Sequence, residues 1–109
     1  MVQADLKATP ANPQARLALG AYCKAKLGRI NDALQDSAAA VTMSRHTDND
    51  VMFKSAVIEA LAGHADRALE DLEQALALGY PAAFARDDWD LRSLRELPKF
   101  KTLISQKIH

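Results

Sequence analysis

A chain of 109 residues is long enough to bury one hydrophobic core, and its single cysteine, Cys23, excludes an intramolecular disulfide. The 14 basic and 14 acidic residues give a formal net charge of zero, which argues against binding to nucleic acid or to an anionic membrane. The N-terminus lacks the basic start and apolar run of a signal peptide, and no stretch approaches the ~18 apolar residues of a membrane span. We therefore expect a cytoplasmic protein.

The chain begins with a segment that carries little pattern and continues with a well-marked helix. Residues 1–11 contain one weak helical turn, and we interpret them as an N-terminal extension or the remnant of a preceding repeat. Asn12 is suited to cap a helix, and Pro13 fits the first turn because its missing N–H would have no partner there. Small and apolar residues then recur at helical spacing up to Gly28, a residue type that readily closes a helix.

Three further helices are predicted up to residue 80. The second helix covers about residues 31–43. The third covers about residues 48–62, and Thr47 and Asp50 at its start have the spacing of a capping box. Gly63 marks the turn into the fourth helix, which ends at a Gly-Tyr-Pro segment. The apolar stripes of the second and fourth helices are Ala33, Leu34, Ala40 and Val41, and Ala68, Leu69, Leu72, Ala75, Leu76 and Leu78.

Residues 81–109 lose the earlier pattern but keep a helical periodicity. Asp87 and Asp88 are placed to cap a helix that contains Trp89, and Pro98 predicts the start of another helix. We expect Trp89 to be buried together with an apolar stripe, which comprises Leu91, Leu94, Leu97, Phe100, Leu103 and Ile104. Because the last unit of a repeat array has one face in water, its sequence departs from the repeat, and we interpret this segment as C-terminal capping helices.

A shift of 35 residues superposes part of the chain on itself. The identical pairs are Ala21/Ala56, Ala25/Ala60, Gly28/Gly63, Ala33/Ala68, Leu34/Leu69, Asp36/Asp71 and Ala40/Ala75. The paired glycines, each followed five residues later by Ala-Leu, are hard to obtain from composition alone. We therefore divide a single domain, residues 1–109, into the N-terminal extension, a first repeat at 12–46, a second repeat at 47–80 and the capping helices at 81–109.

This spacing resembles the tetratricopeptide repeat (TPR) over residues 12–80. The small residues that characterise the family correspond to Ala21, Gly28, Ala33 and Ala40 in one unit, and to Ala56, Gly63, Ala68 and Ala75 in the other. Where the family often has Trp, Leu, Tyr and a second aromatic residue, this chain has Leu17, Gly20, Lys24 and Ser37, and then Met52, Ser55, Glu59 and Leu72. The resemblance implies an all-α fold, a right-handed α-α superhelix of two TPR-like hairpins with a C-terminal helical cap.

The C-terminal segment carries a second resemblance. The Ala-Leu-Gly-Tyr-Pro segment at 77–81, the Asp-Trp-Asp-Leu-Arg segment after it and the Pro-Lys-Phe-Lys that begins at Pro98 are similar to the closing segment of bacterial repeat arrays. Such segments end the repeat regions appended to bacterial signalling proteins, including receptor-like serine/threonine kinases. An Asp usually precedes the proline in that family, whereas this chain has Leu97, so a capping oxygen is missing.

The TPR resemblance also implies a binding site, because the first helices of these repeats line a concave groove that holds peptide ligands. Carried over position by position, the groove comprises Ala18, Tyr22, Lys26, Phe53, Val57 and Leu61. This mostly apolar surface would hold an apolar or amphipathic helical segment. The Lys and Asn residues that clamp a C-terminal carboxylate in chaperone-binding members are absent, so we predict against recognition of a free acidic C-terminus. In the alternative, the C-terminal helices or a second copy of the chain cover Phe53, Val57 and Leu61.

Side chains with catalytic or metal-binding chemistry are scattered along the sequence. The three histidines have no carboxylate or cysteine at metal-ligand spacing, and the aspartates at 87, 88 and 90 lack the pattern of a calcium loop. The serines have no nucleophile elbow, and there is no glycine-rich phosphate loop. We interpret the aspartates as helix caps and surface charge, and the basic residues after position 90 as a solvated helix face. No enzyme activity, cofactor or metal is predicted.

One ion pair between the two repeats is predicted. Lys24 and Glu59 occupy the same repeat position on adjacent first helices, so we expect them to approach each other and form a partly buried pair. The alternative is that water solvates each of them independently.

The function predicted from these patterns is that of a protein-protein interaction module, an adaptor or scaffold that binds a segment of another protein or a peptide. The first alternative is the C-terminal regulatory repeat region of a larger bacterial signalling protein, such as a serine/threonine kinase. Helical-repeat nucleic-acid binding is a distant alternative, and the zero net charge argues against it. Because about three repeats are usually needed for stability, the chain would belong to a longer array or be completed as a homodimer.

Overall fold

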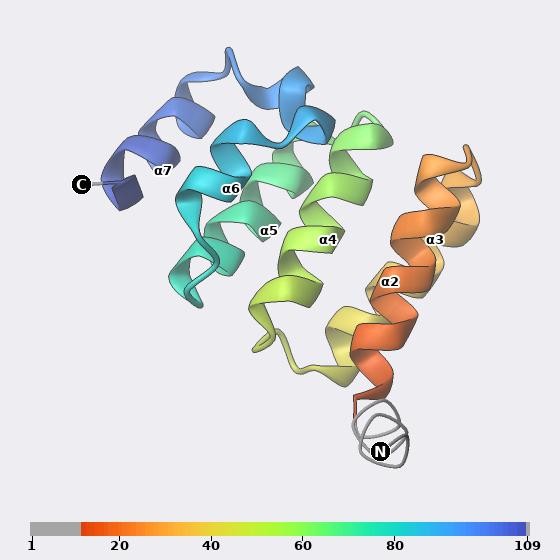
Figure 1. The fold of residues 1–109 in the computed structure, drawn as a ribbon. Helices are drawn as coiled ribbons and strands as arrows, with labels where there is room; N and C mark the ends of the chain where they lie inside the picture. Colours follow the sequence, from red (N-terminus) through yellow and green to blue (C-terminus); the bar gives the residue numbers. More distant parts are fainter. Residues whose placement is uncertain (1–11, 109) are drawn as a thin grey trace, which may run out of the picture.

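The computed structural model describes residues 12–108, and these fold into seven helices without a strand among them. The helices are α2 (Pro13–Lys26), α3 (Ile30–Met43), α4 (Asn49–Leu61), α5 (Ala65–Ala77), α6 (Ala82–Asp87), the 3-10 helix η1 (Trp89–Leu94) and α7 (Pro98–Ile108) (Figure 1). The predicted all-α fold is confirmed over this range. The weak helical turn expected within residues 1–11 lies outside the described residues.

The first hairpin pairs α2 with α3 through the turn that the sequence predicted. Asn12 caps α2, because its side-chain oxygen accepts a hydrogen bond from the backbone N–H of Ala15 at 3.2 Å. Gly28 has a φ of +88°, in the left-handed region that a residue with a Cβ adopts at a cost. The backbone N–H of Arg29 then donates to the carbonyl of Lys24 at 2.8 Å, and this bond closes the helix.

The second hairpin, α4 with α5, uses the same turn 35 residues later. Gly63 has a φ of +84°, and the backbone N–H of His64 donates to the carbonyl of Glu59 at 2.9 Å. Helix α4 packs against both α2 and α3, so the second hairpin stacks directly on the first. The order of helices across the molecule in Figure 1 follows this stacking.

The cap of α4 lies one residue after the position predicted for it. The N-cap is Asp48, whose carboxylate accepts hydrogen bonds from the backbone N–H groups of Asp50 and Val51 at 3.0 and 3.2 Å. The hydroxyl of Thr47 donates instead to the carbonyl of Ser44 at 2.7 Å and closes the preceding turn. A carboxylate is favoured at the cap because it also meets the positive end of the helix dipole. The prediction of Thr47 as the cap is wrong.

Replacing Asp48 with Ala should lower the free energy of unfolding by ~1 kcal/mol, because two N–H groups in the first turn of α4 lose their acceptor. Thr47→Ala removes only a turn hydrogen bond and should have a smaller effect. Urea denaturation followed by circular dichroism measures both changes. A larger loss for Thr47→Ala than for Asp48→Ala would restore Thr47 as the cap.

The small residues of the repeat pattern lie where helices meet or turn. Six alanines have no exposed surface: Ala21, Ala33, Ala40, Ala56, Ala68 and Ala75. Side chains of this size let the helix axes come close together without voids between them. The two glycines serve another purpose, because a Cβ added to Gly28 or Gly63 would meet no atom within 4 Å. Only the positive φ requires glycine there.

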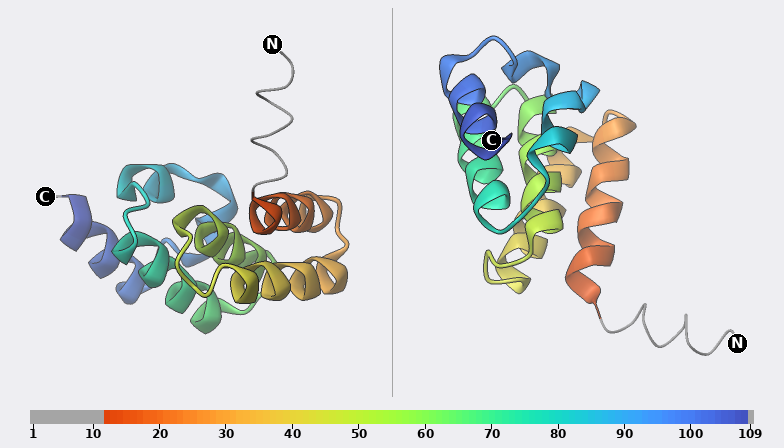
Figure 2. Two further views of the ribbon diagram at one scale, coloured as in Figure 1. Left: turned by 90° about the horizontal axis from the view of Figure 1, so that it is seen from below. Right: turned by 60° about the vertical axis from the view of Figure 1, so that its left-hand side comes forward.

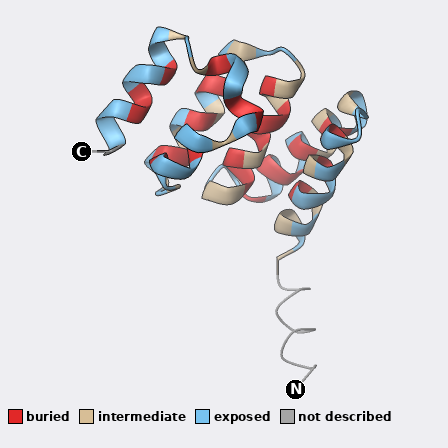
Figure 3. Cartoon of the chain, turned by 45° about the horizontal axis from the view of Figure 1, so that its top comes forward, coloured by how far each residue is buried: buried red, intermediate tan, exposed pale blue. Residues whose placement is uncertain are grey.

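The C-terminal helices fold back over the second hairpin. Helix η1 packs against α4 and α5, and α7 packs against α5 and α6, an arrangement that Figure 2 shows from two sides. Of the predicted apolar stripe, Leu91, Leu94, Phe100, Leu103 and Ile104 are buried and Leu97 is partly buried. Buried residues gather on α4, which lies between the first hairpin and the C-terminal helices (Figure 3). Trp89 departs from the prediction, because it is 67% exposed.

The predicted ion pair between Lys24 and Glu59 does not form. The Lys24 ammonium contacts Asp36 on the other helix of its own hairpin, with Nζ 2.5 Å from Oδ2. Glu59 bonds within its own hairpin too, because its Oε1 lies 2.7 Å from Nδ1 of His64. Lys24 and Glu59 each have a partner within their own hairpin. These local contacts compete with an ion pair between the two repeats.

Candidate functional site

The six positions expected to line a binding groove lie on α2 and α4, on a surface that we call the inner face. Ala18, Phe53 and Val57 are buried, Tyr22 and Leu61 are partly buried, and Lys26 is exposed. Residues 80–94 of the same chain pack over this surface, and we call them the cover segment. Of the two arrangements considered from the sequence, the structure thus has the one in which C-terminal helices cover the inner face.

An aromatic stack holds the first part of the cover segment. The rings of Phe53 and Tyr80 have centroids 4.0 Å apart and planes inclined by 7°. Phe84 packs edge-on against Tyr80, with centroids 6.4 Å apart. Aromatic pairs of this kind contribute ~0.5–1.5 kcal/mol beyond the area that they bury. The ring of Phe53, which we predicted as an anchor for a partner, therefore contacts an aromatic residue of its own chain.

A buried carboxylate holds the second part of the cover segment. Asp90 is 8% exposed, both of its oxygens lie 2.7 Å from Nζ of Lys26, and the hydroxyl of Tyr22 donates to Oδ2 at 3.1 Å. We call these three residues the clasp. The interpretation of Asp90 as a cap or surface charge is wrong; the cap of η1 is Asp88, whose carboxylate accepts from the backbone N–H of Asp90.

The clasp and the stack change the titration of the chain's two tyrosines. Burial and the hydrogen bond to Asp90 together raise the pKa of Tyr22 to about 12, because both favour the protonated phenol and only that form can donate. Burial also raises the pKa of Tyr80 to about 12, with a contribution from the charge of Asp50. The folded protein thus favours the neutral form of both phenols.

Stability should therefore fall at alkaline pH. The raised pKa values of Tyr22 and Tyr80 mean that their stabilising contribution is complete below ~10, the ordinary tyrosine pKa, and is lost as the pH rises through about 12. The double variant Tyr22→Phe/Tyr80→Phe should lose less stability over this interval than the wild type. Chemical denaturation at a series of pH values measures the difference. Identical pH dependence in the two proteins would contradict the prediction.

Removal of the Asp90 carboxylate should loosen the cover segment. Asp90→Ala should lower the free energy of unfolding by about 1–2 kcal/mol, because Tyr22 loses an acceptor; the exposed Lys26 contributes little. Asp87→Ala is a matched control, since Asp87 pairs only with the exposed Arg86, and should change stability by less than ~0.5 kcal/mol. Thermal and urea denaturation measure both variants, and equal effects would mean that the clasp adds no stability.

Two large aromatic side chains of the cover segment are exposed to solvent. Phe84 is 64% exposed and Trp89 is 67% exposed. The guanidinium of Arg92 lies over the indole of Trp89, 4.7 Å from the ring centroid, which fixes the orientation of both side chains. Arg92 also donates to the carbonyl of Trp89 at 3.1 Å. Over the inner face, the surface available to a partner is that of the cover segment.

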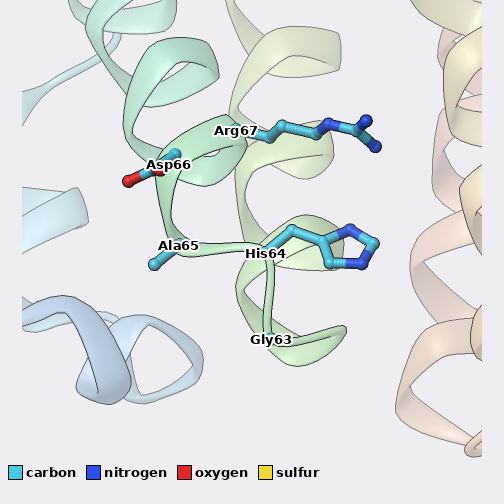
Figure 4. A pocket seen from close by; sticks show the side chains of 5 residues that line it. All are labelled: Gly63, His64, Ala65, Asp66 and Arg67. Atoms are coloured by element: carbon cyan, nitrogen blue, oxygen red, sulfur yellow. The ribbon is translucent and has the colours of Figure 1, made fainter.

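A hollow at the turn between α4 and α5 has no convergent chemistry. Its lining comes from five consecutive residues, Gly63, His64, Ala65, Asp66 and Arg67 (Figure 4). The side chains of His64 and Arg67 extend to one side, whereas Asp66 points to the other. The Nδ1 atom of His64 is already hydrogen-bonded to Glu59. The hollow therefore does not bring together groups that could act on one ligand.

The remaining polar side chains are mostly engaged with one another. No group of three or more His, Cys, Asp or Glu side chains that could hold a metal is found within residues 12–108, and His109 lies outside them. In the basic tail, Lys99 pairs with Glu73 at 3.5 Å and Lys101 with Glu96 at 3.3 Å. Within the described part of the chain, each helix is too short or too polar to cross a membrane.

Compared with known proteins, the chain matches no family model, no curated protein and no solved structure. The described residues form an inner face covered by the chain's own residues 80–94, a clasp that fixes the cover, and two exposed aromatic side chains on the cover.

Proposed function

We propose that the protein is a protein-protein interaction module, an adaptor of the helical-repeat type that the tetratricopeptide resemblance suggests. The observation that carries this proposal is the exposure of Phe84 and Trp89 on a segment whose residues Ala85, Leu91 and Leu94 are buried in the core. Exposed apolar surface is unfavourable in water by ~25 cal/mol per Å², and side chains of this size expose a large apolar area. Burial against a partner would recover that free energy.

The chemistry of this surface supports recognition of another protein. Tryptophan, tyrosine and arginine are the residues in which binding energy is most often concentrated at protein interfaces, and here Trp89 and Arg92 are stacked beside each other. The clasp and the stack on Phe53 hold the cover segment in place, so little conformational entropy is lost on binding. We propose a partner segment with apolar side chains that pack on Phe84 and Trp89.

The proposal differs from the groove expected at first, because the partner would contact the cover segment and not the inner face. Tyr22 and Lys26 would take part indirectly, through the carboxylate of Asp90. The same module would serve as a regulatory repeat region of a larger bacterial signalling protein, which differs only in what it is joined to. Nucleic-acid binding is disfavoured, because the net charge is zero and Lys99 and Lys101 are paired with carboxylates.

We further propose that the module works in the cytoplasm and has no enzymatic activity, cofactor or metal. In support, no group of His, Cys, Asp and Glu side chains able to hold a metal is found among residues 12–108, and the hollow at the α4–α5 turn brings no reactive groups together. A homodimer is one form in which a repeat of the second copy would stack on the two repeats of this chain and so provide the third repeat that stability usually requires.

The double variant Phe84→Ala/Trp89→Ala should lose its partner in affinity capture from the source cell followed by mass spectrometry. Met43→Ala is the matched control, because Met43 is a 49% exposed apolar residue at the C-terminal end of α3, the end of the first hairpin opposite the turn where Lys26 contacts Asp90. Met43→Ala should keep the wild-type unfolding midpoint, whereas the double variant also loses the edge-on contact of Phe84 with Tyr80, so circular dichroism has to show that it remains folded. A partner retained by the folded double variant, or lost equally by Met43→Ala, would refute the proposed surface.

A further inference from the structure

A second feature of the structure lies between the two hairpins, away from the cover segment. A cleft of about 220 Å³ opens between α3 and the α4–α5 hairpin. Its lining combines aliphatic and polar side chains: Leu34, Ser37, Ala38, Val41, Thr42, His46, Ser55, Glu59 and Asp71. This volume is small for a drug-sized ligand but suits a single short aliphatic chain.

The hydroxyl of Ser37 is a buried polar group without a partner. Ser37 is 3% exposed, and its Oγ has no hydrogen-bond partner in the structure. Leaving such a group unsatisfied costs ~1–3 kcal/mol, and most buried polar atoms in proteins are hydrogen-bonded. Because Ser37 lines the cleft, a ligand there would supply the missing partner.

Two carboxylates make the same cleft electronegative. Asp71 accepts a hydrogen bond from the hydroxyl of Ser55 at 2.5 Å, and no lysine or arginine of residues 12–108 pairs with it or with Glu59. Burial raises the pKa of Asp71, and the charge of Glu59 raises it further; the Ser55 hydrogen bond and the charge of His46 act in the opposite direction. Glu59 thus has only the His64 ring as a partner, and neither carboxylate has a lysine or arginine beside it within the described residues.

The first repeat shows which group would compensate them. The shift of 35 residues places Lys24 on Glu59 and Asp36 on Asp71. In the first hairpin, the Lys24 ammonium lies 2.5 Å from the Asp36 carboxylate. In the second hairpin, the carboxylate of that pair is kept and the lysine is replaced by a second acid. The first hairpin thus has a lysine ammonium beside its carboxylate, whereas the second hairpin has the corresponding carboxylate, Asp71, without a lysine.

We propose that the cleft between the hairpins binds a primary ammonium group, carried by a small alkyl amine or by a lysine side chain. An ammonium has three N–H donors, and the carboxylates of Asp71 and Glu59 and the hydroxyl of Ser37 can accept them. The aliphatic side chains of Leu34 and Val41 would contact the methylene groups of the ligand. The lining of this site includes neither Phe84 nor Trp89, so the ammonium-binding proposal does not depend on the proposed partner surface.

The probe for this site is n-butylammonium, titrated into the full ¹⁵N-labelled chain at mildly alkaline pH and followed by amide chemical shifts. We expect saturable shifts confined to the residues around Ser37, Ser55 and Asp71. Tetramethylammonium, a cation without N–H donors, and n-butanol, an uncharged chain of the same length, should give no saturable shifts. Equal affinity for tetramethylammonium, or shifts spread over surface carboxylates, would overturn the proposal.

Two variants test the residues that carry the site. Glu59→Lys recreates the ammonium–carboxylate pair of the first hairpin, so it should remain folded and weaken n-butylammonium binding at least tenfold. Asp71→Asn should weaken binding similarly, whereas Glu73→Gln, which alters an exposed acid on the same helix, should not. Unchanged affinity in folded Glu59→Lys and Asp71→Asn would reject the assignment of the cleft.

A further titration separates the two sources of the ammonium. N-acetyl-lysine-methylamide has the lysine side chain with both ends of the residue blocked, as in a polypeptide. Binding as tight as that of n-butylammonium would identify a lysine side chain of a partner as a suitable ligand. Tighter binding of n-butylammonium would identify a free amine. Binding of neither compound would overturn the proposal.

Discussion

The close contact of helices at alanine is the constraint on which the rest of the structure depends. At six positions related by the 35-residue shift, a side chain of a single carbon lies with no exposed surface between two helices. A larger residue at any of them would force the axes apart or impose an unfavourable rotamer, at a typical cost of ~1–3 kcal/mol. With the hairpins held this closely, few large side chains are needed in the first repeat. The larger apolar residues are gathered instead on α4 and on the helices that follow it.

That distribution explains why the inner face is covered. Helix α4 carries Val51, Met52, Phe53, Val57 and Ile58, and an apolar helix of this kind needs packing partners on more than one side. Two hairpins alone supply neighbours on the α2, α3 and α5 sides only. The cover segment supplies the remaining side through Tyr80, Leu91 and Leu94. The surface that a longer repeat array would leave open to a ligand is thereby made part of this chain's core.

Local patterns of sequence were sufficient for the four helices of the two hairpins, the two glycine turns and the buried alanines, but they did not predict α6. These features depend on residues three to five positions apart, and Asn12, Gly28 and Gly63 act as their types suggest. The cap of α4 could not be decided in this way, because Thr47 and Asp48 are both good capping residues and only the turn with Ser44 distinguishes them.

The candidate site was harder to predict, because its contacts join distant parts of the chain. The clasp connects Asp90 with residues 64 and 68 positions away, and no spacing rule links them. Trp89 was expected to be buried on account of its size, but the short 3-10 helix turns it outward while Leu91 and Leu94 face the core. Lys24 was assigned to the wrong partner because repeat position alone ignores the acid across its own turn.

The clasp has a consequence for how the molecule folds. In a simple repeat array each unit contacts only its neighbours, so folding can start in one unit and spread along the chain. Here η1 touches the second hairpin, while Asp90 reaches the first hairpin as well. Closing that loop requires both hairpins to be in place, and contacts of such long sequence separation slow folding. Because these contacts tie the two repeats to the C-terminal helices, we expect the chain to unfold as one cooperative unit and not one hairpin at a time.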